Sequence, residues 1–257
     1  MADYSSFELQ GKVAVVTGGT KGIGGAIATA YAQAGCNVAV ASRTVKDCEA
    51  KQAELEKIGI KALGVPADIT KIDEIKKLNK AVLDKFGKID VLVNNAGTAV
   101  TKLSEELTEA DWDYVVDLNL KAQFFCSQIL SESMRERKTG SIIMINSGFG
   151  IRPEKRVLPY CASKGGLVQV ARVLAIEWYA KYQIRVNSLV PGYFKTDINE
   201  EVMSNQKIYD TIRKRSPMNR FGELPELVGA ALFMASDKLA SYMTGQMLIV
   251  DGGTYPY

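Results

Sequence analysis

Short apolar runs alternate with amphipathic stretches of helical spacing along nearly the whole chain. The runs are continuous and rich in Val and Ile, as expected for strands covered by helices on both faces. Because strands joined through helices pair in parallel with right-handed crossovers, the alternation predicts an α/β fold with one doubly wound parallel sheet. The expected strands are residues 13–17, 37–41, 60–65, 90–94, 141–146, 184–189 and 247–250. The expected helices are residues 22–34, 46–58, 72–86, a long helical pattern within 112–137, 160–179 and 226–236.

The length of 257 residues fits one α/β domain, and no linker, tandem repeat or low-complexity segment divides it. We therefore expect a single domain over residues 1–257. The least regular part is the polar segment 193–224, which follows the Pro191-Gly192 turn and contains Pro217. After the sixth strand, such an excursion lies over the carboxyl ends of the sheet, where ligands of these folds bind. We expect it to cover a substrate; an ordinary surface excursion is the alternative.

The absence of histidine excludes several kinds of active site. Without one, the chain has no Ser-His-Asp or Cys-His mechanism and no histidine metal site. The four cysteines are scattered without a C-x-x-C pair, which argues against a zinc site and a disulfide framework. No metal is expected, and acid/base chemistry near neutral pH must come from a perturbed Tyr, Lys, Cys, Asp or Glu.

Charge and hydropathy limit the partners. The formal net charge of +3 is too small to indicate a nucleic-acid or membrane surface. No apolar run approaches the ~18–20 residues of a membrane span, and the opening MADYSSFELQGK lacks the apolar core of a signal peptide. We expect a cytoplasmic protein that binds neither nucleic acid nor membrane.

Residues 16–24 read VTGGTKGIG and join the first expected strand to the first expected helix. Glycine permits a sharp turn and lets the backbone approach a pyrophosphate, and the following helix N-terminus offers free N–H groups. The spacing G-x-x-x-G-x-G differs from the general G-x-G-x-x-G fingerprint, so the interpretation depends on the strand–turn–helix context. The nucleotide contacts expected here are Gly18, Thr20, Lys21, Gly22, Ile23 and Gly24.

The end of the second strand discriminates between NAD and NADP. The sequence NVAVASRT has no carboxylate that could accept a hydrogen bond from a ribose 2′-hydroxyl. Ser42 and Arg43 stand there, and Lys21 lies in the glycine turn, so a hydroxyl and two cations are available for a 2′-phosphate. NADP(H) is therefore the expected cofactor; a merely solvated Arg43 is the alternative.

Further cofactor contacts are expected after the third and fourth strands. The aspartate of VPADIT is either a helix-start residue or the acceptor for the adenine amino group. The NNAG motif at the carboxyl edge can tie neighbouring strands and present its backbone to the cofactor; a plain turn is the alternative. The expected contacts are Asp68, Ile69, Asn95, Ala96 and Gly97.

Tyr160 and Lys164 stand four residues apart in LPYCASKGG. If this stretch is helical, the two side chains lie on one face about one turn apart. A phenol with a pKa near ~10 is almost inert at neutral pH, but a fixed ammonium beside it favours the phenolate and lowers that pKa. Without histidine, a tuned tyrosine is the best candidate for an acid that quenches the charge left by hydride transfer.

The chain resembles the short-chain dehydrogenase/reductase family over almost its whole length. The resemblance is carried by TGGTKGIG, NNAG, LNLKAQF around Asn119, INSG around Ser147, YCASK and VNSLVPGYFKT, in this order. It implies a Rossmann-type sheet of seven parallel strands in the order 3-2-1-4-5-6-7, and a homotetramer or homodimer.

The resemblance also implies roles for individual residues. Tyr160 is expected to give a proton to the carbonyl oxygen during reduction, and Lys164 to lower its pKa and bond the nicotinamide ribose. Ser147 is expected to polarise the substrate oxygen, and Asn119 to hold a water chain that resupplies protons through Lys164. The contacts implied near the nicotinamide are Pro191, Gly192, Phe194 and Thr196.

The sequence says less about the small-molecule substrate. The C-terminal part from SPMNRFG onwards resembles gluconate 5-dehydrogenase and sorbose reductase-like members, which favours a sugar acid, ketose, polyol or related small ketone. A 3-oxoacyl thioester and a hydroxysteroid are the alternatives. A catalytically silent NADP-binding sensor is a hypothesis of another class, against which the four intact catalytic residues argue.

Overall fold

The computed structural model describes residues 7–196 and 203–254. Its centre is a seven-stranded parallel sheet with the order β3-β2-β1-β4-β5-β6-β7, which confirms the predicted topology. Every pair of neighbouring strands is parallel, so the carboxyl ends of all seven lie at one edge. The strands are β1 Val13–Thr17, β2 Asn37–Ser42, β3 Ala62–Pro66, β4 Val91–Asn94, β5 Gly140–Ile145, β6 Ile184–Pro191 and β7 Met247–Val250.

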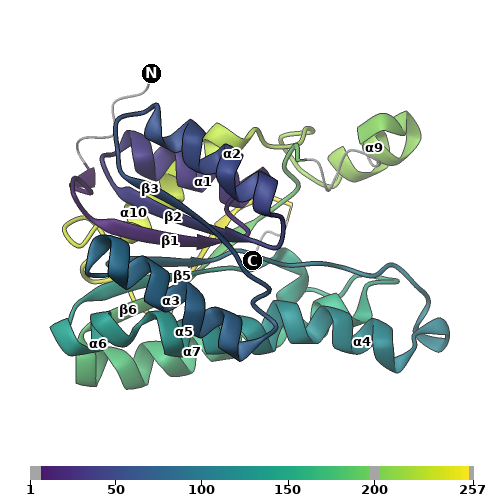
Figure 1. Cartoon of the computed structure of the whole chain (residues 1–257). Coiled ribbons are helices and arrows are strands. Elements are labelled where there is room, and N and C mark those ends of the chain that lie inside the picture. Colours follow the sequence, from purple (N-terminus) through teal and green to yellow (C-terminus); the bar gives the residue numbers. More distant parts are fainter. Residues whose placement is uncertain (1–6, 197–202, 255–257) are drawn as a thin grey trace.

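Helices cover both faces of the sheet (Figure 1). One apolar core lies between the sheet and α1, α2 and α10, and the other lies between the sheet and α3, α5 and α7. The central strands are buried on both sides, which explains their continuous apolar sequences. The helices are α1 Gly22–Gln33, α2 Val45–Glu56, α3 Ile72–Phe86, α4 Glu109–Val116, α5 Ala122–Leu130, α6 Glu132–Arg137, α7 Leu158–Tyr182, α9 Gln206–Arg213 and α10 Leu224–Ala235.

The long helical pattern expected within residues 112–137 is not one helix. A π-helical turn, η3 (Asp117–Lys121), separates α4 from α5, and a break at Ser131 separates α5 from α6. Because both breaks are short and flanked by helix on either side, the helical spacing of the sequence did not reveal them. α7 begins at Leu158, two residues earlier than expected, with Pro159 in its first turn, where a missing N–H costs nothing.

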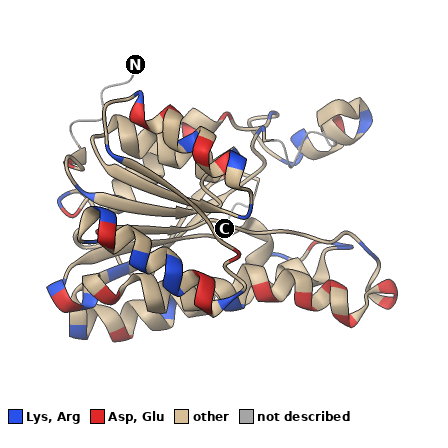
Figure 2. Cartoon of the chain, viewed as in Figure 1, with Lys and Arg blue, Asp and Glu red and all other residues tan. Residues whose placement is uncertain are grey.

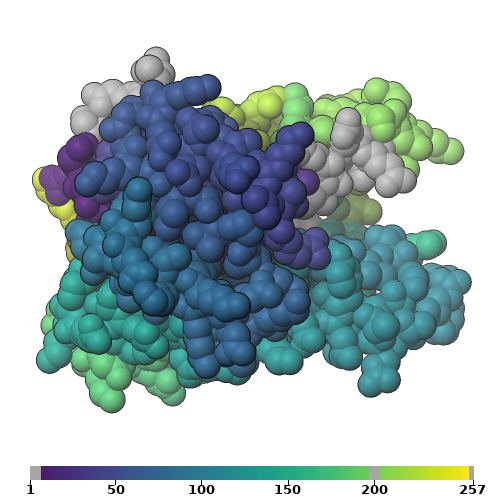
Figure 3. All heavy atoms as spheres, in the orientation of Figure 1, coloured from purple at the N-terminus to yellow at the C-terminus, as the bar shows by residue number. Residues whose placement is uncertain are grey.

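Segment 193–224 leaves the end of β6 and returns beside its own start. Phe194 and Gly222 form an isolated parallel bridge, with hydrogen bonds from Gly222 N to Tyr193 O (2.9 Å) and from Lys195 N to Gly222 O (3.0 Å). Between these points the segment carries α9, which projects beyond the sheet on the same side as α4 (Figure 1). A space-filling view shows a notch between the α9 and α4 parts of the molecule (Figure 3). Residues 197–202 of the segment lie outside the described residues, and its covering role stays a prediction, as does the single-domain organisation.

Two absences apply to the described ranges. Within residues 7–196 and 203–254, no helix is long and apolar enough to cross a membrane. The same ranges contain no group of three or more Cys, Asp or Glu side chains placed to hold a metal ion.

Candidate active site

The glycine turn after β1 has the backbone geometry that its sequence requires. Gly18 and Gly22 have φ values of +62° and +56°, in the left-handed region that favours glycine. Gly24 is needed for space, because a Cβ atom there would lie 2.3 Å from Asn95 Nδ2 and 2.4 Å from Gly18 O. Asn95 Nδ2 donates to Thr17 O and Gly18 O, both at 3.0 Å. Asn95 therefore ties the end of β4 to the glycine turn, as expected of the NNAG motif.

The N-terminus of α1 is open to an anion. Its N-cap residue, Lys21, makes no side-chain capping bond, and the first turn carries no acidic residue. The first N–H groups of the helix therefore have no side-chain acceptor, and the positive end of the helix dipole adds to their attraction for a phosphate. Thr20 and Ile23 flank this point. The turn and the helix start thus fit a dinucleotide pyrophosphate.

The end of β2 carries the hydroxyl and the cation that the sequence predicts. Ser42 Oγ accepts a hydrogen bond from Thr44 N (3.2 Å), while Arg43 and Lys21 are exposed. No carboxylate lies on β2 itself, and the nearby Asp68 is oriented by Thr70, which donates to it from its N (3.1 Å) and Oγ1 (2.7 Å).

The carboxyl of Asp68 has a pKa below its ordinary value. Burial raises this pKa, but the hydrogen bonds from Thr70 and the charges of Lys71 and Arg43 outweigh that effect. Asp68 is therefore an ionised acceptor that also orders the turn before α3, so both interpretations of this residue agree with its contacts. Ile69 beside it is buried, and the adenine contact stays a prediction.

Ser147 and Tyr160 meet at the carboxyl end of β5. Ser147 follows this strand by two residues and caps the 3-10 turn η4 (Gly148–Gly150), where its Oγ accepts from Phe149 N at 3.2 Å. Since that bond uses a lone pair, the Ser147 hydroxyl hydrogen points elsewhere, and the Ser147 side chain is hydrogen-bonded to Tyr160. The pairing of these two side chains across 13 residues was expected only from the family resemblance.

The protonation of Tyr160 differs from the prediction. Burial raises the pKa of the phenol; the hydrogen bond with Ser147 opposes this and Cys161 adds to it. Lys164 does not lower the pKa in this structure, because its ammonium donates to Ile145 O (2.7 Å) and lies 5.7 Å from the centroid of the Tyr160 ring. The expected direction was therefore wrong for the protein alone. Tyr160 is a neutral phenol, which is the form that donates a proton.

Lys164 is itself strongly perturbed. The side chain is only 3% exposed, and burial lowers the pKa of its ammonium to about 8. At neutral pH the group keeps its proton. A buried cation is thus placed one helical turn below the Tyr160 phenol, as the spacing predicts.

Asn119 lies inside the π turn η3 and is fully buried. Its Oδ1 accepts from Thr98 N (2.8 Å), and its Nδ2 donates to Thr98 O (2.8 Å) and to Ser163 Oγ (3.3 Å). Its side chain therefore fastens the loop after β4 to α7, and its role toward a water chain stays a prediction. π turns are frequent at functional sites, so the position of Asn119 in one agrees with the role expected for it.

Gln123 is a residue that the sequence analysis missed. The π turn pairs Ala122 N with Asp117 O instead of Leu118 O, and Gln123 Nε2 donates to the released Leu118 O at 3.1 Å. The same nitrogen donates to Ala96 O in the NNAG motif. Gln123 thus couples the π turn to the cofactor edge. Its signal in the sequence was a buried amide in an otherwise apolar helical stretch.

The residues expected near the nicotinamide differ in burial and in whether their side chains are available to a cofactor. A Cβ atom at Gly192 would lie 2.6 Å from Asp251 Cα, so the close approach of these two backbones requires glycine. Pro191 is buried at the end of β6, and Thr196 is partly exposed. The Phe194 ring packs into the core against Gly222, so only the backbone of Phe194 is available to a cofactor.

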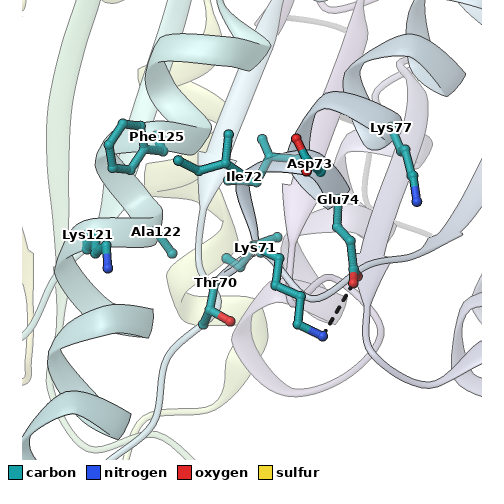
Figure 4. Close-up of a pocket in the computed structure, with 11 residues that line it drawn as sticks. Thr70, Lys71, Ile72, Asp73, Glu74, Lys77, Lys121, Ala122 and Phe125 are labelled. Atoms are coloured by element: carbon teal, nitrogen blue, oxygen red, sulfur yellow. Dashed lines mark ion pairs between the residues drawn. The ribbon is translucent and has the colours of Figure 1, made fainter.

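A cavity of about 490 Å³ lies between α3 and α5 (Figure 4). Ala122 and Phe125 of α5 line one side and Ile72 of α3 the other, with the Lys71–Glu74 ion pair at the rim. The cavity borders Ile69 and Thr70, beside the expected adenine position. None of the four expected catalytic residues lines it.

The glycine turn, the open helix start and the Ser147–Tyr160 pair with the buried Lys164 at one sheet edge define a class of protein: an oxidoreductase that moves a hydride between a dinucleotide and a carbon bearing oxygen. A family model described as enoyl-(acyl carrier protein) reductase matches residues 18–255. Together with the relatives described next, this match shows that the chain belongs to the short-chain dehydrogenase/reductase family.

Three relatives illustrate the range of this family. The chain is 34% identical to gluconate 5-dehydrogenase of Gluconobacter oxydans, with 98% of each protein covered. It is 37% identical to the 3-oxoacyl-[acyl-carrier-protein] reductase FabG of Staphylococcus epidermidis, covering 95% of this chain and 99% of the relative. A solved gluconate 5-dehydrogenase of Burkholderia cenocepacia, in complex with NADP and tartrate, superposes with a TM-score of 0.92 at 31% identity, covering 98% of this chain and 97% of that one.

Proposed function

We propose that the protein is an NADP(H)-dependent oxidoreductase that interconverts a carbonyl group and a secondary alcohol of a sugar acid. The observation that carries this function is the Ser147–Tyr160 hydrogen bond at the carboxyl end of β5, with the buried Lys164 beneath the phenol. This arrangement faces the edge at which the glycine turn and the open end of α1 would hold a dinucleotide.

The cofactor is NADP(H). Ser42, Arg43 and Lys21 present a hydroxyl and two exposed cations, which suit a 2′-phosphate. A structural relative of the same family was solved with NADP. When bound, this cofactor supplies or accepts the hydride.

Tyr160 supplies the proton in the direction of reduction. Its raised pKa keeps the phenol protonated at neutral pH, so it donates a proton to the oxygen that gains negative charge. The Ser147 hydroxyl, whose Oγ is held by Phe149 N, orients the same oxygen by hydrogen bonding. In the oxidation direction the Tyr160 phenolate accepts the proton of the substrate alcohol, and the Ser147 hydroxyl orients the alcohol oxygen.

Lys164 and Asn119 support this proton donor. The Lys164 ammonium donates to Ile145 O and keeps a buried positive charge beneath the phenol, from which a proton can be returned to Tyr160. Asn119 joins the Thr98 loop to Ser163 of α7, which holds the helix carrying Tyr160 against the cofactor edge. Proton resupply to Tyr160 through Lys164 is part of the proposal.

A sugar acid is the favoured substrate because relatives covering nearly the whole chain act on gluconate at C5. The second candidate is a 3-oxoacyl thioester, which the FabG relative of similar identity supports. A silent NADP-binding sensor is the least favoured, since the Ser147–Tyr160 bond and the buried Lys164 are both in place.

A direct test follows NADPH consumption with purified protein on 5-keto-D-gluconate, L-sorbose, acetoacetyl thioesters and a ketosteroid. We expect the highest kcat/KM with the keto acid and a preference for NADPH over NADH. Turnover of the thioester alone would favour the second candidate, and no turnover of any compound would favour the sensor. For the cofactor, Arg43→Ala should reduce the ratio of kcat/KM with NADPH to kcat/KM with NADH. If wild type uses NADH as well as NADPH and this ratio is unchanged in Arg43→Ala, the NADP(H) assignment is contradicted.

We also propose that the protein works as a homo-oligomer in the cytoplasm. Val173, Ile176 and Tyr179 lie on one face of α7 and are 50%, 75% and 43% exposed, which marks an apolar stripe suited to a subunit contact. Sedimentation should give a dimer or tetramer, and Ile176→Glu should reduce the oligomeric state. A monomeric wild-type protein would refute this part.

A further inference from the structure

A row of aromatic rings leads from Tyr160 into segment 193–224. The Phe149 ring meets Tyr160 and Tyr193 edge-on, with centroid distances of 6.3 Å in each case. Tyr193 in turn stacks on Phe221 at 5.4 Å. Tyr193 therefore stands one ring away from the proton donor, on segment 193–224.

Beyond Tyr193 lies an ion pair between Arg215, just after α9, and Glu154, in the loop between η4 and α7. The two residues are 61 positions apart in the sequence. Glu154 contacts the helix of the proton donor, because Cys161 Sγ, beside Tyr160, donates to Glu154 O (3.9 Å). Burial raises the pKa of the Tyr193 phenol, and Arg215, Glu154 and Tyr160 are the groups whose charges act on it. The pair is thus a near neighbour of the reacting centre.

The stability of the fold does not explain why this ion pair is present. The Arg215 and Glu154 side chains are 44% and 27% exposed, and ion pairs open to solvent contribute little to the free energy of folding. Arginine has a planar guanidinium whose donors match the two oxygens of a carboxylate, which makes it suited to recognition. A ligand carboxylate can replace Glu154 as the acceptor without loss of this geometry.

The two walls of the notch differ in charge. The α4 wall is acidic, and Figure 2 shows red residues along it. This wall is formed by residues 104–121, which comprise α4 and the turns on either side of it. It holds one lysine, Lys121, and six acidic residues, two of which pair with lysines (Asp111 with Lys102 and Asp117 with Lys121): Glu105, Glu106, Glu109, Asp111, Asp113 and Asp117. Among the described residues 203–215, the α9 wall carries Lys207, Arg213, Lys214 and Arg215 and one acid, Asp210, which pairs with Arg213. An anionic group entering the notch is therefore repelled by the α4 wall and attracted to the α9 wall.

We propose that Arg215 is the residue that binds the carboxylate of the substrate, with the chain of the sugar acid running along Tyr193 to place its keto group at Tyr160. Glu154 holds the guanidinium over the site and competes with the substrate for it. This assignment rests on the proposed sugar-acid function. It gives segment 193–224 a specific task, which is selection of acids over neutral ketoses.

The test uses two substrates that differ only in charge. 5-Keto-D-gluconate has the carbon skeleton and configuration of L-sorbose, with a carboxylate in place of one CH₂OH group. NADPH-coupled kinetics with both compounds are measured for wild type, Arg215→Ala, Arg215→Lys and Glu154→Gln. Lys214→Ala is the matched control for the overall charge of the α9 wall, because it removes one positive charge from the exposed neighbour of Arg215, which makes no direct contact with the substrate in this proposal.

We expect Arg215→Ala to raise KM for the keto acid about tenfold or more, as for a lost charge-assisted bond, and to leave KM for L-sorbose within about twofold. Arg215→Lys should recover part of the affinity, because it keeps the charge without the fork. Glu154→Gln should lower KM for the keto acid, since it removes the competing acceptor. Lys214→Ala should leave both values nearly unchanged.

Other results overturn the assignment. If Arg215 and Glu154 only hold two segments together, both variants will weaken both substrates in the same direction. An unchanged KM for the keto acid in Arg215→Ala, with wild type active on that acid, refutes the role of Arg215 alone. Absence of wild-type turnover of the keto acid refutes the sugar-acid function itself, and the Arg215 assignment with it.

Discussion

The catalytic centre and segment 193–224 are built in opposite ways. Asn119 is fully buried and Lys164 almost so, and each is held by short hydrogen bonds to the backbone of another element. α9 has no buried residue. The described part of the segment is anchored at its two ends by the buried Phe194, Ser216 and Phe221, by the bridge and by a hydrogen bond from Ser216 Oγ to Gly252 O, and otherwise by ring contacts and partly exposed ion pairs. The difference indicates that the reaction depends on a fixed centre, whereas substrate choice depends on a surface that tolerates change.

The largest effect should come from the proton donor. Tyr160→Phe removes only the hydroxyl, and we expect kcat to fall by about 10²–10⁴-fold, since general acid catalysis contributes that much. NADPH binding, measured by fluorescence titration, should persist. Tyr209→Phe in α9 is the matched control, and it should keep near-normal turnover. Near-normal turnover of Tyr160→Phe with intact NADPH binding would contradict the mechanism.

Crowding of the glycine turn should come next. In Gly24→Ala the new methyl group would meet Asn95 Nδ2 and Gly18 O at 2.3 and 2.4 Å, so we expect NADPH affinity to fall about tenfold or more as the turn is displaced. Gly59→Ala is the control. Its φ of +101° is strained for alanine, but no atom lies within 4 Å, so it should cost about 1–2 kcal/mol of stability and no affinity. Equal NADPH affinity in both variants would show that the glycine turn accommodates a methyl group at residue 24.

Because Lys164 loses its proton at basic pH, activity and stability should change with pH in opposite directions. Its pKa is lowered from 10.5 to about 8, so the folded protein binds fewer protons than the unfolded chain between these values. Stability from this group therefore rises with pH through that window, being lowest where the buried ammonium is charged. Reduction should decline several-fold over the same range, as Lys164 loses the proton that it returns to Tyr160.

Thermal unfolding and kcat measured from pH 7 to 10.5 check this point. In Lys164→Met the rise in stability should disappear, and turnover should be low at every pH. If kcat and stability of wild type change with pH in the same direction, a group other than Lys164 controls activity at basic pH.

The smallest effect should come from a substitution in α10, outside both the catalytic centre and segment 193–224. Gly229 lies inside α10, and a Cβ atom there would have no neighbour within 4 Å. Gly229→Ala should therefore raise the free energy of unfolding by about 0.5–1 kcal/mol through helix propensity, with unchanged kinetics. A loss of stability on denaturant unfolding would indicate an additional contact at this face.

Much of the fixed centre could be predicted from the sequence, because its signals are local. The positive φ values of Gly18 and Gly22 and the spacing of Tyr160 and Lys164 belong to single elements. The direction of the Tyr160 pKa could not be predicted, since it depends on burial by distant segments and not only on a neighbouring cation. The π turn around Asn119 was hidden for a similar reason, because its released carbonyl is satisfied by a side chain, that of Gln123.

The second region was predicted only in outline. The prolines and polar residues of 193–224 indicated an excursion, but its pairing with a loop 61 residues earlier depends on tertiary structure. The meeting of Arg215 and Glu154 leaves no periodic or motif signal in either segment. Contacts of this kind become visible only when the sheet has brought its carboxyl ends together.

The Phe194–Gly222 bridge has a consequence for evolution and engineering. It closes the excursion at its base, so β6 and α10 are joined across a fixed gap whatever lies between. Beyond the bridge, Phe221 is buried and Ser216 Oγ donates to Gly252 O (2.7 Å), so exchanges of the insert that keep these two residues leave the frame that bears Tyr160 in place. A library confined to this insert would explore new substrates without disturbing the machinery that reduces them.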